Sequence, residues 1–531
     1  MKKKVVLLSA LALYLVVDGE KAGEDIESLM TIMRRTRMHR INRNSLLKPA
    51  FWALVFTWCV VFFYQIKPLV PYDLDDWTYI AYRRLAIPVW GLWNPSKVLP
   101  ELLLPFCSEV GVRLIMPFLK DYLHSLSLSY ALFTGAFICV YLILMERMLR
   151  GMFKLGRFQA YLLAVFYLVL HFWLLRTGED RNNHMLFAKN LNCFFNYVIP
   201  NVLNASLVLY FFCNDPEENN GRNYWQKGIL FLAVYMGIFS NLFQEVVLVS
   251  FIGCRLVLKL VEMVKSKRTI PQYIKDNKVS LSIIAAWLLT CIFEANGGRA
   301  RSLTSVKMDV FTTVKNLIAW KGKLNKFCVA VCILLILAGV FTYIRSNKKD
   351  PVIESYKKIW IYSLISMMLC LSYLVLLCSK TGSEDMLLSS VIFAPVFYGF
   401  IIVVASAALV LYRNPSISIV LPILILVCVT DCDYGQNTYK AFNQVGLTEQ
   451  QCYDVGNYMI DQLKQAEESG SKTAELHVPY SHIKDTNWPH STELFGKRFL
   501  RTMLRHGMIS RKIELTIVPD ESVNESFYIK Y

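Results

Sequence analysis

Apolar residues gather along the chain in blocks of about 17 to 23, the length that crosses a hydrocarbon core of about 30 Å as a helix. Short polar stretches separate these blocks. The pattern predicts eleven membrane-spanning helices, at residues 50–66, 126–145, 158–175, 195–213, 228–243, 245–262, 279–295, 326–344, 359–378, 390–412 and 416–431. An amphipathic stretch near 103–119 is expected to lie along the membrane interface.

The last hundred or so residues follow the pattern of a soluble segment. Residues 448–467 predict a helix that Thr448 caps, with Gln451 completing a capping box. Residues 491–505 predict a second, basic helix. The stretches that alternate like strands are 473–478 and 512–518.

These patterns predict an all-α polytopic membrane protein with a small C-terminal α/β domain. The expected parts are a cytoplasmic segment at 1–49, a transmembrane domain at 50–431 and an extracytoplasmic domain at 432–531. Composition agrees, because 18% of the 531 residues are charged and the mean hydropathy is +0.38. Soluble chains average about 25% charged residues.

The net charge of +17 predicts an orientation in the membrane rather than a nucleic-acid partner. Lys and Arg collect in the loops at 146–157, 263–278 and 345–358, which alternation of the spans places in the cytoplasm. The loop at 214–227 belongs to the same side but carries acidic residues, so it is the weak point of the scheme. An odd number of spans then places the C-terminal tail, residues 432–531, outside the cell.

Polar residues at the outer ends of spans are the candidates for chemistry, because polar groups at membrane depth are costly. Asp73, Asp75 and Asp76 follow the first span. Adjacent carboxylates can raise one another's pKa, act as a general base or hold a divalent cation. The alternative is structural, since Asp also suits the first turn of a helix.

Four further polar residues are candidates for substrate binding. Lys97 and Glu101 lie in a stiff segment with two prolines. Asn196 stands at the outer mouth of a span, where an amide can bind sugar hydroxyls or cap a helix. Glu245 begins a span after a tight turn, with no basic neighbour in sequence, so it needs a partner or a role.

A basic turn follows the seventh predicted span. Arg299 and Arg301 come after paired glycines at 297–298, and guanidinium groups bind phosphate in a forked geometry. Two arginines outside the membrane run against the usual charge bias, which favours a binding role. The chain has no nucleotide-binding glycine motif and no zinc-type histidine spacing.

Four short motifs, DDW, NPSKVLPE, FFNYVIPN and ANGGRARS, together resemble the GT-C class of membrane glycosyltransferases. More narrowly, they look like a bacterial group that includes O-antigen glucosyltransferase-type proteins. The resemblance covers residues 50–430. Residues 1–45 and the tail carry no part of it.

The resemblance implies a polyprenyl-phosphate-linked sugar as donor and a surface glycan as acceptor, at the outer face of a bacterial plasma membrane. Asp75 and Asp76 match the place of the acidic base or metal ligand, with Mg²⁺ or Mn²⁺ as a possible cofactor. Arg299 and Arg301, with Lys97, would neutralise the leaving phosphate, and the anomeric centre would invert.

Two other classes of function remain open. A secondary transporter or flippase of a lipid-linked or polar solute would carry ionisable residues near the midplane, often on broken helices within repeats. A non-catalytic scaffold or sensor would act through the tail. Asn replacements of the acidic pair, followed by analysis of the surface glycan, would separate both from a glycosyltransferase.

Overall fold

A computed structural model gives the fold of the chain. The structure describes residues 43–82, 97, 99–175, 184–188, 190–218, 221–297, 303, 305–432, 447–480 and 492–529. Most of the predicted cytoplasmic segment, residues 1–42, lies outside this range. The first helix begins at Arg43, so it starts inside the segment that was predicted to end at residue 49.

Eight helices in the described residues are long and apolar enough to cross a membrane. These spans are Leu47–Ile66, Pro100–Leu119, Tyr122–Phe153, Leu191–Cys213, Lys278–Ala295, Lys326–Arg345, Pro351–Thr381 and Ser389–Arg413. The first span joins α3 (Arg43–Val61) to η1 (Phe62–Ile66), the second joins η3 (Pro100–Leu102), α5 (Leu103–Val110), η4 (Gly111–Ile115) and α6 (Met116–Leu119), and the fourth joins α9 (Leu191–Cys193), η5 (Phe194–Val198) and α10 (Ile199–Cys213). Each of the other five spans is one helix: α7 (Tyr122–Phe153), α14 (Lys278–Ala295), α17 (Lys326–Arg345), α18 (Pro351–Thr381) and α19 (Ser389–Arg413). The chain is a multi-pass, mainly helical membrane protein.

The other helices are shorter, more polar or part of the connections. They are α4 (Leu74–Tyr79), α8 (Arg157–Trp173), α11 (Tyr224–Ile238), α12 (Leu242–Lys265), α13 (Ile270–Asp276), α16 (Val310–Lys323), η6 (Ser383–Leu387), η7 (Pro415–Ile419) and α20 (Val420–Asp431).

Seven of the eight candidate spans overlap predicted ones. The eighth, Pro100–Leu119, contains the stretch that was expected to lie along the interface. The predicted spans at 158–175 and 416–431 correspond to helices of at most 17 residues, and those at 228–243 and 245–262 correspond to α11 and α12. The total of eleven spans therefore stays a prediction.

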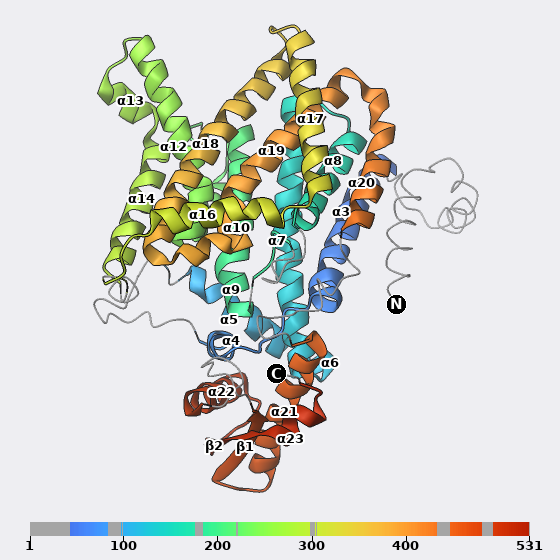
Figure 1. Ribbon diagram of the computed structural model, residues 1–531, viewed down its shortest axis with the longest axis vertical. Helices are drawn as coiled ribbons and strands as arrows, with labels where there is room; N and C mark the ends of the chain where they lie inside the picture. Colours follow the sequence, from blue (N-terminus) through green and yellow to red (C-terminus); the bar gives the residue numbers. More distant parts are fainter. Residues whose placement is uncertain are drawn as a thin grey trace, which may run out of the picture.

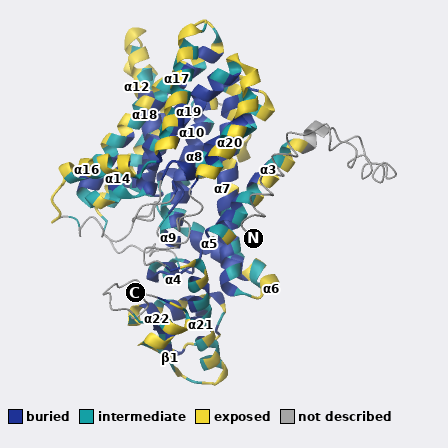
Figure 2. Ribbon diagram, turned by 45° about the vertical axis from the view of Figure 1, so that its right-hand side comes forward, coloured by how far each residue is buried: buried dark blue, intermediate teal, exposed yellow. Residues whose placement is uncertain are grey.

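Helices α7 and α19 form the centre of the bundle (Figures 1 and 2). α7 packs against α3 and α10, whereas α19 packs against α17 and α18. Gly339 allows a close approach of α17 to α19, because a Cβ atom there would lie 2.5 Å from the Cβ of Ser406. The outer side of α17 exposes Leu334, Leu337 and Phe341, as expected for a lipid-facing surface.

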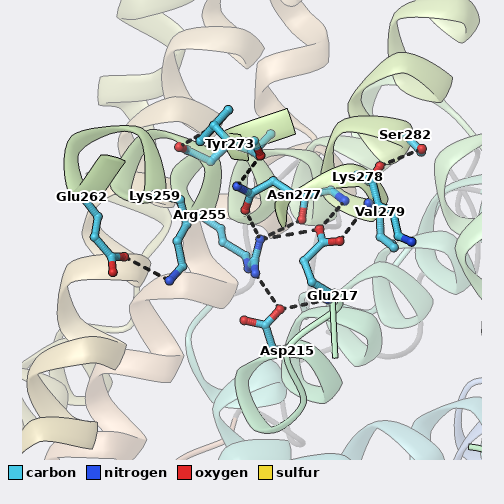
Figure 3. A network of polar contacts seen from close by, with 12 residues as sticks. Asp215, Glu217, Arg255, Lys259, Glu262, Tyr273, Asn277, Lys278, Val279 and Ser282 are labelled. Atoms are coloured by element: carbon cyan, nitrogen blue, oxygen red, sulfur yellow. Dashed lines mark hydrogen bonds and ion pairs between the residues drawn. The ribbon is translucent and has the colours of Figure 1, made fainter. Parts of the chain in front are cut away.

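The bundle has two distinct ends. The tail-side end carries α4, α5 and the C-terminal elements at 449–526, and the opposite end carries α13 and the α17–α18 connection (Figure 1). At the opposite end Arg255 donates to Asp215 at 2.5 Å and to Asn277 at 3.1 Å (Figure 3). The 214–227 loop therefore lies at the end that carries the 263–278 loop, as the predicted alternation requires.

The C-terminal elements form a two-stranded parallel sheet with helices beside it. They are α21 (Glu449–Glu468), β1 (Thr473–Pro479), α22 (Glu493–His506), β2 (Glu514–Asp520) and α23 (Glu521–Ser526). The sheet pairs Thr473 with Glu514 through to Pro479 with Asp520. Both predicted helices and both predicted strands are present, including the capping box of Thr448. The placement of this segment as an extracytoplasmic domain stays a prediction.

Candidate functional site

The acidic run after the first span forms the start of α4 at the tail-side end. Asp73 caps the helix, and its carboxylate accepts the backbone N–H of Asp75 at 2.9 Å. The Asp76 carboxylate accepts the backbone N–H groups of Tyr72 and Asp73, each at 3.2 Å. Two of the three aspartates therefore form a capping box, the structural role that the sequence left open.

Asp76 is fully buried and joins two distant segments of the chain. Its Oδ1 accepts the backbone N–H of Asn192 at 2.7 Å. Burial and the charge of Asp73 raise the pKa of Asp76 to about 8, although the backbone N–H donors act to lower it. Asp76 thus anchors α9 to α4, and backbone N–H groups occupy both of its carboxylate oxygens.

Asp75 faces different surroundings from Asp76. Its side chain is 47% exposed, and its Oδ1 lies 3.4 Å from Nη1 of Arg498 on α22. The two carboxylates therefore do not converge on a common ligand. The described residues contain no group of three or more His, Cys, Asp or Glu side chains that could hold a metal ion. The divalent cation thus stays a prediction, with no ligand set in this part of the chain.

Helix α22 packs directly on α4. The ring of Phe499 meets the buried ring of Trp77 edge-to-face, with centroids 4.8 Å apart. The hydroxyl of Thr502 donates to the backbone carbonyl of Trp77. Arg501 lies over the ring of Tyr82, 3.9 Å from its centroid. The tail therefore holds the helix that carries the acidic pair.

A second contact joins α22 to the start of α7. His506 is 5% exposed, and its Nδ1 lies 2.6 Å from the hydroxyl of Tyr122. Burial lowers the pKa of His506 to about 4, against the opposing effect of Glu109. Arg505 forms an ion pair with Glu109 at 3.5 Å.

A small cavity lies beside the junction of α4 and α9. Its lining residues are Tyr79, Pro100, Glu101, Leu104, Asn192, Phe195 and Asn196. The amide Nδ2 of Asn196 donates to both the backbone and the side-chain oxygen of Asn192, each at 2.8 Å. Because Asn192 also binds Asp76, the candidates Glu101 and Asn196 lie close to the acidic pair.

The candidates Lys97 and Glu245 form a second cluster on the same side. Lys97 pairs with Glu294 at the end of α14, with Nζ and Oε1 2.9 Å apart. The charges of Lys97 and Glu294 both act on the buried carboxylate of Glu245. Lys97 and Glu101 are four residues apart, so their short segment links this cluster to the cavity. Together they form one tail-side polar site.

Arg299 and Arg301 lie outside the described residues, so their binding role stays a prediction. Sequence reasoning missed Arg498 and Glu294 as members of the site. The basic character of the helix at 491–505 was a signal for Arg498, but its partner lies 423 positions away. Glu294, near the end of an apolar block, carried no comparable signal.

Comparisons with known proteins identify no relative of this chain. No protein-family model, no curated protein and no solved structure matches the chain. The chemistry of the tail-side site therefore rests on its own residues.

Proposed function

We propose that this chain is a GT-C-type glycosyltransferase of a bacterial plasma membrane. It transfers a sugar from a polyprenyl-phosphate donor to a cell-surface glycan at the tail-side end, with inversion of the anomeric centre. The multi-pass helical fold supports this assignment, because a lipid-linked donor stays in the membrane. The tail-side polar site supports it by placing carboxylates and amides at one end of the bundle.

The charge distribution supports an extracytoplasmic tail-side end. The basic loops at 146–157, 263–278 and 345–358 supply Lys and Arg at the opposite end. Such loops favour the cytoplasm. The tail-side site then faces the outer leaflet, where an acceptor glycan can reach it.

The half-exposed carboxylate of Asp75 carries the proposal. General-base catalysis needs a carboxylate that an acceptor hydroxyl can reach. Asp76 is fully buried, so its part is positioning, because it fixes the start of α4 and the segment at Asn192. Asn196 and Glu101, in the cavity beside it, offer amide and carboxylate groups to sugar hydroxyls.

Sugar transfer is a single displacement at the anomeric carbon. The acceptor hydroxyl oxygen forms a bond to the anomeric carbon while the bond from that carbon to the phosphate oxygen breaks. The hydroxyl proton passes to Asp75, and the electron pair leaves on the polyprenyl phosphate. Arg498, whose Nη1 lies 3.4 Å from Oδ1 of Asp75, supplies positive charge for the developing phosphate.

Transfer in membrane vesicles tests this proposal. Radiolabelled sugar on polyprenyl phosphate is supplied with glycan from the host, and incorporation is counted for wild type, Asp75→Asn and Asp461→Asn. We expect Asp75→Asn to lower the rate by about 10²- to 10⁴-fold, the contribution of a general base. Asp461 is an exposed carboxylate of α21 and serves as the matched control. Equal rates for all three proteins would refute the role of Asp75.

One observation favours the alternative, a secondary transporter. The side-chain oxygens of Asn201, Asn204, Gln244 and Glu245 are buried without hydrogen-bond partners among the described residues. Unpaired acceptors inside a helix bundle suit a pathway for a proton or a polar solute. Uptake into vesicles, driven by a proton gradient and lost in Glu245→Gln while glycan transfer is absent, would establish this second function.

A further inference from the structure

Glu245 begins α12 inside the bundle, and its side chain is completely buried. Neither carboxylate oxygen has a hydrogen-bond partner among the described residues. A buried carboxylate without a partner is costly, so such a group is usually a functional site. The question is which ligand this carboxylate accepts.

The neighbours of Glu245 are aromatic and polar. Trp287 on α14 faces the carboxylate, yet its indole Nε1 is also buried without a hydrogen-bond partner. The ring of Tyr373 on α18 packs against Trp287, with centroids 5.8 Å apart. Among the described residues, the indole N–H that faces the carboxylate and the two carboxylate oxygens thus have no close hydrogen-bond partner, and they lie beside a pair of aromatic rings.

Among the described residues of the cluster, the one ammonium group is already paired, which disfavours an anion as the ligand. Lys97 is paired with Glu294 at 2.9 Å, and Glu245 adds a second carboxylate. The described part of the cluster therefore holds two carboxyl groups and one ammonium group. The pairing with Glu294 occupies the ammonium group that was expected to meet a phosphate. Hydroxyl groups, by contrast, donate to a carboxylate without adding charge.

We propose that Glu245, Trp287 and Tyr373 form a subsite for an uncharged sugar ring. The carboxylate accepts two ring hydroxyls, the indole N–H donates to a hydroxyl oxygen, and the aromatic rings pack against the apolar face of the sugar. Sugar rings that carry a carboxylate group, as uronic acids do, are rejected. This subsite rests on the proposed glycosyltransferase function and names its substrate class.

Cys291 provides a built-in reporter for this subsite. It lies on α14 next to Glu245, Glu294 and Tyr373, and it is only partly buried. Alkylation of Cys291 by a membrane-permeable maleimide is followed by peptide mass spectrometry in the full-length protein. The probes are polyprenyl phosphate alone, polyprenyl phosphate bearing glucose, galactose, mannose or N-acetylglucosamine, a uronic-acid counterpart, and soluble methyl glycosides of the neutral sugars. Cys213, exposed at the opposite end, is the internal control.

We expect at least one uncharged sugar probe to slow alkylation of Cys291 severalfold while Cys213 reacts at an unchanged rate. Polyprenyl phosphate alone and the uronic-acid probe should give no protection. Protection by the lipid-linked sugar identifies the donor as the source, and protection by a methyl glycoside identifies the acceptor. Equal protection by sugarless polyprenyl phosphate, or no protection by any probe, would overturn the subsite.

Substitutions separate the subsite from the transfer reaction. Glu245→Gln should weaken protection by about 10-fold or more, because the amide replaces one of the two acceptor oxygens with a donor nitrogen. Glu146→Gln, which alters a fully buried carboxylate paired with Arg150 on α7, should leave protection unchanged. Asp75→Asn should abolish transfer and keep protection. If the wild-type protein transfers sugar but no probe protects Cys291, only the subsite is refuted. If a sugar probe protects Cys291 but the wild-type protein transfers no sugar, only the glycosyltransferase function is refuted.

Discussion

At the scale of single residues, neighbouring carboxylates with the same chemistry have different roles because their surroundings differ. Asp76 is buried and bound by three backbone N–H groups, whereas Asp75 is half exposed beside Arg498. Sequence spacing placed both in the first outer loop. It could not tell them apart, because burial of Asp76 depends on Asn192, 116 positions away.

The buried His506 makes a pH-dependent contact between tail and bundle. Its pKa falls from an ordinary value of about 6.5 to about 4 in the folded protein. The folded state therefore binds fewer protons than the unfolded state between these values, so stability is full above pH 6.5 and is lost as pH falls towards 4. The loss amounts to at most about 3 kcal/mol.

Limited proteolysis of the tail between pH 4 and 7 checks this expectation. Cleavage of wild type should accelerate below pH 6.5, and His506→Phe should flatten this dependence because the buried imidazole is removed. Groups facing His506 that share the interface are Tyr122, Glu109, Arg113 and Arg505. Identical pH profiles for wild type and His506→Phe would show that another group controls the contact.

At the scale of elements, hydrophobic periodicity predicted seven of the eight candidate spans, and the two sets differ where polar residues interrupt a helix. The stretch near 103–119 was expected at the interface, whereas Pro100–Leu119, which carries Glu109 and Arg113, is long and apolar enough to cross a membrane. In the structure these residues form an ion pair one helical turn apart at 2.5 Å. α12 falls outside the candidate spans and carries Glu245, Arg255, Lys259 and Glu262. Arg255 pairs with Asp215, 40 positions away, so a short window of sequence cannot reveal that partner.

The loop between α10 and α11 is fixed by the guanidinium of Arg255. Burial acts to raise the pKa of Asp215, but the hydrogen bond from Arg255 holds this pKa below its usual value. Glu217 accepts the backbone N–H groups of Val279 and Ser280, at 3.0 and 2.8 Å (Figure 3). These contacts hold the loop against the start of α14.

Arg255→Met should therefore lower the free energy of unfolding by about 1–3 kcal/mol. This is less than the loss of a fully buried ion pair, because Asp215 is partly exposed to solvent. Thermal unfolding in detergent measures the effect. Arg268→Met is the matched control, because Arg268 forms an exposed pair with Asp276 at 3.7 Å and should change stability little. An equal effect of both substitutions would contradict the role of Arg255.

At the scale of the whole molecule, helix connections from distant parts of the sequence meet at two ends. Charge bias in the loops predicts which end faces the cytoplasm, but the tertiary contacts decide which loops share an end. Sequence therefore predicted the multi-pass class and the soluble-type tail. It did not predict that α22 would pack on α4, because that contact joins residues more than 400 positions apart.

Labelling with an impermeant maleimide tests the orientation. In a Cys213→Ser background, cysteine introduced at Glu468 should react from outside intact cells, because α21 lies at the tail-side end. Cysteine introduced at Ser266, beside α13, should react only after the membrane is opened. The reverse pattern would place the tail-side site in the cytoplasm and contradict the proposed direction of transfer.

The central claim is sugar transfer that depends on Asp75. Mass spectrometry of the surface glycan tests it most directly, in host cells that carry wild type, Asp75→Asn or Asp461→Asn at equal membrane abundance. We predict that one sugar is missing from the glycan of the Asp75→Asn cells and present in the other two. An unchanged glycan in the Asp75→Asn cells would contradict the claim.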